Sequence, residues 1–128
     1  MAVAEKNLGQ SVVFLRCKVS SLPSQMPADF EKEFCQALAS NLSRDLSTPF
    51  QLTAEEGWRG EGAAVVVDVR MASTNRAEVT ISPGRAEEGA FKANSSTTTS
   101  LTSIDRPLSP ASSRTLVRGI GLVLGIID

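Results

Sequence analysis

The sequence has 128 residues, a formal net charge of −1, no histidine and no tyrosine. A nucleic-acid-binding domain typically carries a basic surface and aromatic side chains that stack on bases, so this composition argues against a nucleic acid partner. The lack of histidine removes the commonest general base and the commonest metal ligand together. We therefore expect no cofactor and no metal site.

Residues 1–10 are polar and are expected to be a flexible N-terminus, followed by a single α/β domain at 11–128. The Ala2-Val3-Ala4 stretch is typical either of the end of a cleaved export signal or of an ordinary frayed terminus, and both interpretations stay open. No stretch of about 20 apolar residues is present, so a membrane-spanning helix is not expected.

Alternating side chains predict a first strand at 11–20, with Arg16 and Lys18 on its polar face. Its apolar face carries Val13, Leu15, Cys17 and Val19. A helix is predicted from about Pro27 to about Leu46, because large apolar residues recur at every fourth position. These residues are Phe30, Phe34, Leu38, Leu42 and Leu46. Such a stripe is typical of a helix that covers one face of a sheet.

A short strand is predicted at 50–53, and two stronger strands at 63–71 and 77–82 form a hairpin. A turn is expected at 83–89 because it contains proline and two glycines. The Ser/Thr-rich segment 90–104 favours one more edge strand, with a strand pair that has a thin buried face and a partly disordered loop as the two alternatives.

A last helix, capped by Ser112 or Ser113, is predicted to continue through the apolar run that ends at Ile127. The order of elements predicts an α+β fold, namely a two-layer sandwich. Its sheet is expected to be mostly antiparallel with about four or five strands, and both helices are expected to pack on one face.

Cys17 on the first strand and Cys35 on the first helix lie on elements that should pack together. They form a disulfide in one interpretation, which requires an oxidising compartment. In the other they are two core cysteines, since the sequence does not fix their Cα separation.

Four residues are candidates for contact with a partner. Trp58 and Arg59 lie in a glycine-rich loop, where a tryptophan either anchors a partner or closes one end of the core. Leu122 and Ile126 belong to a terminal run that is apolar nearly all round. A two-layer fold cannot cover a helix on every side, so these residues serve either the core or an interface.

No catalytic constellation is evident. Asp68 lies in an apolar strand, and we interpret it as an outward carboxylate paired across the strands with a base such as Arg70 or Arg76. The glycines at 119, 121 and 125 lack the spacing of a dinucleotide-binding motif and are expected to permit close helix packing. We therefore expect a protein that is not an enzyme.

The order of the predicted elements resembles that of the N-terminal α/β domain of TolB. The elements concerned are the strand at 12–19, the helix Phe30 to Leu46, the strand at Phe50 and the stretch from Trp58 to Val69. They are also similar to other small periplasmic or lipoprotein domains. The resemblance covers about residues 11–82, and the TolB propeller has no counterpart in this sequence. The resemblance implies a non-catalytic domain that binds other envelope proteins.

We therefore expect a non-catalytic protein-binding module of the bacterial cell envelope, in the periplasm or at the outer membrane, with the cytoplasm as the alternative. Its protein partner is not identified by the sequence, and an oligomer is compatible with it. The alternative function is a structural subunit of a larger secretion or phage-like assembly that packs through the terminal helix. An enzyme that uses Asp68 is the third hypothesis.

Overall fold

The computed structural model describes residues 12–53, 61–87 and 89–126. Its elements, in chain order, are β1 (Val13–Ser20), α2 (Phe30–Asp45), β2 (Phe50–Leu52), β3 (Gly62–Ser73), β4 (Arg76–Glu87), β5 (Ala90–Ala93), β6 (Thr97–Thr102), the 3₁₀ helix η1 (Pro110–Leu116) and α3 (Val117–Val123).

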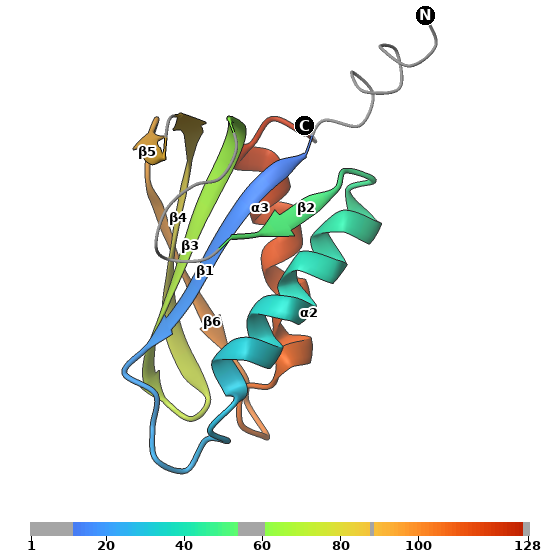
Figure 1. The fold of residues 1–128 in the computed structure, drawn as a ribbon. Helices are drawn as coiled ribbons and strands as arrows, with labels where there is room; N and C mark the ends of the chain where they lie inside the picture. Colours follow the sequence, from blue (N-terminus) through green and yellow to red (C-terminus); the bar gives the residue numbers. More distant parts are fainter. Residues whose placement is uncertain (1–11, 54–60, 88, 127–128) are drawn as a thin grey trace, which may run out of the picture.

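The strands form one six-stranded sheet, and the helices form a second layer on one of its faces (Figure 1). The sheet order is β2-β1-β3-β4-β5, and β6 also pairs with β4. β1 pairs in parallel with β2 and β3, whereas β4 is antiparallel to β3, β5 and β6. The predicted α+β fold with both helices on one face is thus confirmed, with one strand more than expected.

The core lies between the two layers. The predicted stripe of α2 is buried, with Phe34, Leu38 and Leu42 fully enclosed. It packs against the inward residues of the central strands, which include Leu15 and Val67. Burying a side chain of this kind stabilises the fold by roughly 1.5–3 kcal/mol, so this stripe holds α2 on the sheet.

A disulfide between Cys17 and Cys35 joins β1 to α2, with a Cα–Cα distance of 5.6 Å. Close to it, the N–H group of Val19 donates a hydrogen bond of 2.8 Å to Glu31 Oε2 on the first turn of α2. These two links attach the helix to the half of β1 that extends beyond β2. The position of α2 along the sheet is therefore set by covalent and polar contacts as well as by apolar packing.

The outer side of β4 differs from the prediction. The segment 83–87, where a turn was expected, is the end of β4. The segment 90–104 forms two strands, as in the strand-pair alternative, and not the single edge strand that was favoured. β6 pairs with β4 from Arg76 to Ile81, and β5 pairs with it from Gly84 to Glu87. A side chain at position 84 would collide with the carbonyl oxygen of Lys92, so glycine allows β5 to approach.

The C-terminal helix also begins differently from the prediction. η1 starts at Pro110, and the N–H of Ser109 donates to Ser112 Oγ at 3.0 Å. Proline suits a first helical position because it has no N–H to satisfy there. Ser113 is not a cap: it is fully buried, and its hydroxyl accepts a 3.1 Å hydrogen bond from Asn41 Nδ2 on α2. None of the helices in the described ranges is long and apolar enough to span a membrane.

Candidate protein-interaction site

β2 forms one edge of the sheet. The N–H of Val13 donates to the carbonyl of Pro49, and the N–H of Thr53 donates to the carbonyl of Leu15, each at 2.9 Å. Because backbone polar groups alternate between the two sides of a strand, the N–H and C=O of Leu52 point away from β1. The N–H of Phe50 points the same way and donates to Ser43 Oγ on α2 at 2.9 Å.

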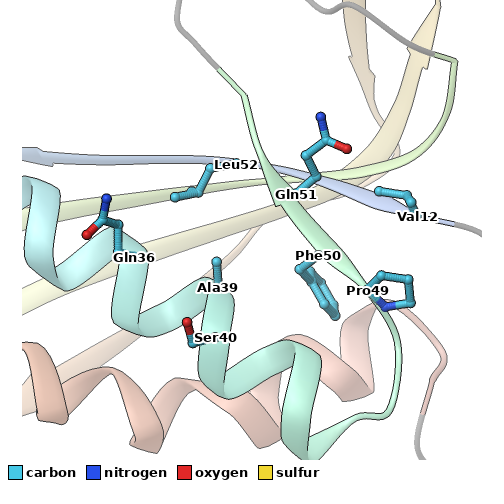
Figure 2. A pocket seen from close by; sticks show the side chains of 8 residues that line it. All are labelled: Val12, Gln36, Ala39, Ser40, Pro49, Phe50, Gln51 and Leu52. Carbon is cyan, nitrogen blue, oxygen red and sulfur yellow. The ribbon is translucent and has the colours of Figure 1, made fainter.

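A shallow depression of about 620 Å³, here called the β2 hollow, lies between this edge and α2 (Figure 2). Its lining residues are Val12, Gln36, Ala39, Ser40, Pro49, Phe50, Gln51 and Leu52. Phe50 is 8% exposed, whereas Leu52, on the same side of the strand, is 37% exposed. The hollow therefore combines an exposed leucine with amide and hydroxyl groups, and none of its described lining residues is charged.

β6 lies at the opposite edge. The N–H of Ser103 donates to the carbonyl of Asn75 at 2.9 Å, next to the paired residues Arg76 and Thr102. The same alternation then directs the N–H and C=O groups of Thr98, Ser100 and Thr102 away from β4. This edge consists almost entirely of threonine and serine.

A second depression of about 340 Å³, here called the β6 groove, separates β6 from α3. Its lining residues are Ile81, Thr97, Thr99, Ser100, Thr115, Leu116, Gly119, Leu122 and Val123. Leu122 is 42% exposed. The helix layer covers Leu101 of β6 but does not extend to Thr97 and Thr99, which remain exposed although they lie on the helix side of the sheet. In the part of the chain that the structure describes, no charged side chain lines this groove either.

The four predicted contact residues fall in different places. Leu122 lies in the β6 groove, whereas Ile126 is half-buried and packs against the core. Trp58 and Arg59 lie outside the described residues. Leu52 was not among the predicted contact residues, because the exposure of a residue in a three-residue strand depends on the position of α2 relative to that strand.

Two of the three terminal glycines, Gly119 and Gly125, do not pack closely as expected, whereas Gly121 is buried within α3. A Cβ added to Gly119 would meet nothing within 4 Å, and the residue instead lines the β6 groove. Gly125 follows the end of α3 with a φ of +75°, a left-handed conformation that glycine adopts at helix ends.

Asp68 lies on the sheet face opposite the helices and is exposed. Its register neighbours are Lys18 on β1 and Thr80 on β4, whereas Arg76 pairs with Ser73 at the far end of the hairpin. The cross-strand base beside Asp68 is therefore Lys18. Within the described residues, no group of three or more cysteine or acidic side chains is arranged to hold a metal ion.

Two neighbouring side chains on the last turn of α2, Arg44 and Asp45, have shifted pKa values. Arg44 Nε donates a 2.9 Å hydrogen bond to Asp45, which lowers the pKa of that carboxyl and raises the pKa of the guanidinium. Both side chains are exposed, and neither lines the β2 hollow or the β6 groove. The described lining of both depressions is thus neutral.

The chain matches no protein-family profile and no curated protein sequence. Its fold resembles that of PelC. The PelC dodecamer from Paraburkholderia phytofirmans superposes with a TM-score of 0.57 at 12% identity, over 91% of this chain and 88% of PelC. The hypothetical protein CT253 from Chlamydia trachomatis gives 0.56 at 13% identity, over 91% and 98% of the two chains. XCC0632 from Xanthomonas campestris, a DUF330 protein, gives 0.50 at 10% identity, over 90% and 84%.

These similarities correct the resemblance to TolB. The structures to which this fold is similar include PelC, CT253 and the DUF330 protein, and they do not support the N-terminal domain of TolB as its relative. The TolB resemblance depended on the order of elements over residues 11–82. Element order does not specify strand pairing, and it included neither β6, which completes the sheet, nor the terminal helix, which completes the second layer.

Proposed function

We propose that the chain is a non-catalytic structural subunit of a protein assembly in the bacterial cell envelope. The observation that carries this proposal is the pair of neutral depressions at opposite edges of the sheet, each containing an exposed leucine. Among the described residues, Leu52, Leu122 and Ile104 are the exposed large apolar side chains, so two of these three lie at the depressions. Apolar side chains beside hollows are typical of surfaces that become buried in a contact.

The fold similarity supports assembly over binding of an unrelated partner. PelC is described as a dodecamer, and its chain aligns with nine-tenths of this one. At 12% identity this similarity concerns the fold, so assembly of the present chain is a proposal supported by its own two edges. A different protein that docks on one edge is the alternative.

The envelope location is supported by the disulfide between Cys17 and Cys35. Disulfides persist in oxidising compartments such as the bacterial periplasm and are rare in the reducing cytoplasm. The non-catalytic character is supported by the absence of histidine from the sequence and by the exposed, cross-strand position of Asp68.

Light scattering of the purified, oxidised chain tests this proposal. We expect a molar mass that is a multiple of the chain mass, and we expect Leu122→Glu to reduce it because the substitution places a charge in the β6 groove. Ile104→Glu is the matched control, because Ile104 is 91% exposed and lines neither depression. A native chain that keeps the single-chain mass at every concentration would overturn the proposal.

A further inference from the structure

We propose that copies of this chain join head to tail, with the β2 edge of one copy against the β6 edge of the next. This inference rests on the proposed function and names its contact surfaces: the β2 hollow with Leu52, and the β6 groove with Leu122. The occupant of each edge is thus a second copy of the same chain.

Strand directions support this arrangement. β2 runs parallel to β1 and β3, and β6 is antiparallel to β4, which is itself antiparallel to β3. β6 therefore runs parallel to β2. A copy placed beside β6 in the same orientation brings its own β2 alongside as a parallel neighbour, which continues the sheet. The helix layers of both copies then lie on the same side.

The outward backbone groups provide hydrogen-bonding partners for this contact. Leu52 directs its N–H and C=O away from β1, and Thr98 and Ser100 direct theirs away from β4. An edge strand with such groups is a template for addition of another strand. The remaining half of β1 is unsuitable, because Glu31 already accepts the N–H of Val19 there.

The side chains of the two edges are also compatible. Leu52 and Leu122 both lie on the helix side of the sheet, so a continued sheet would bring them into one apolar contact between the layers. Gln36 and Ser40 on one rim face Thr97 and Thr99 on the other, and all four carry groups that can donate and accept hydrogen bonds. None of the described residues that line the two depressions is charged, so a contact between them desolvates no unpaired charge of these residues.

Symmetry separates this arrangement from pairing of like edges. Two β2 edges related by a twofold axis would close at two copies and leave the β6 groove exposed. A head-to-tail contact uses both edges of every copy. It gives a ring where the small rotation between successive copies closes, and an open filament where it does not.

Two variants with different disabled edges provide the test. Leu52→Glu disables the β2 edge and Leu122→Glu disables the β6 edge, and both positions are exposed enough for the substituted chains to fold, which circular dichroism verifies. Each variant by itself is expected to have the single-chain mass in sedimentation equilibrium. Their equimolar mixture is expected to form a complex of two chains, because it contains one intact β2 edge and one intact β6 edge. The total protein concentration is raised for this mixture, because each chain in the two-chain complex makes one contact, whereas each chain of the native assembly makes two.

The outcomes are distinguishable. If the native chain assembles but the mixture stays at the single-chain mass, the contact is not head to tail and this inference is overturned, while the proposed function stands. If the native chain is itself monomeric, the proposed function and this inference fail together. The control variant is Ile104→Glu, which takes the place of either variant in the mixture. It retains both edges and should assemble as the native chain does.

Discussion

Gly84 is the residue at which β4 changes its outer partner from β6 to β5. A Cβ at this position would collide with the Lys92 carbonyl oxygen and would lie close to the Ala93 Cα. Both obstacles are backbone atoms, so they can move only if β5 moves. We expect Gly84→Ala to lower the free energy of unfolding by about 2 kcal/mol, as overpacking does, and urea denaturation measures this change.

Gly119 provides the matched control for that substitution. It lies within α3, and a Cβ there would meet nothing within 4 Å. Alanine is the better helix former, so Gly119→Ala should raise the free energy of unfolding by about 0.5–1 kcal/mol. If both substitutions lowered the free energy of unfolding by the same amount, the approach of β5 to β4 would not require glycine at position 84.

At the scale of elements, the disulfide between Cys17 and Cys35 fixes α2 to β1. The two residues are separated by 18 positions. In the chain-entropy account, closing a loop of this length stabilises the folded state by about 3 kcal/mol. We therefore expect a reductant to lower the urea midpoint of the native chain, whereas the double variant Cys17→Ala/Cys35→Ala should not respond to it. A native chain whose midpoint is indifferent to the reductant would contradict this role of the bond.

The elements that the sequence predicted well are those whose apolar residues follow a clear period. The stripe from Phe30 to Leu42 and the alternation in β3 identify their buried faces directly. β6 has no such signal, because five of its six residues are threonine or serine and only Leu101 is buried. It is a strand because β4 presents a complementary edge, which is a long-range property that local pattern does not contain.

Pro83 and Gly84 misled the prediction for a related reason. Their residue types favour a turn, but in the structure Pro83 pairs with Val65 and its carbonyl accepts the N–H of Asn94 at 2.8 Å. The candidate site, like the fold, could be predicted from the sequence only in part. Leu122 could be found because an apolar run on all sides of a helix exceeds what one sheet can cover. Leu52 could not, since its exposure arises from the spacing between β2 and α2.

At the scale of the whole molecule, the neutral character of both edges predicts how assembly depends on pH. Among residues 12–53, 61–87 and 89–126, no titratable side chain lines the β2 hollow or the β6 groove. The assembled mass should therefore stay constant between about pH 5 and about pH 9, where surface carboxylates and lysines keep their charges. Light scattering across this range checks the expectation. A transition within it would indicate that a charged surface elsewhere makes the contact.

The edge-to-edge contact is tested most directly by hydrogen–deuterium exchange at low and high protein concentration. The amide groups of Leu52 and Ser100 point outward from the two edges, so the head-to-tail assembly predicts that their exchange slows as the concentration rises. The amide of Val19, already bonded to Glu31 within one chain, should exchange at the same rate throughout. Exchange at Leu52 and Ser100 that stays unchanged while the chain assembles would contradict the account, because the contact would then lie away from both sheet edges.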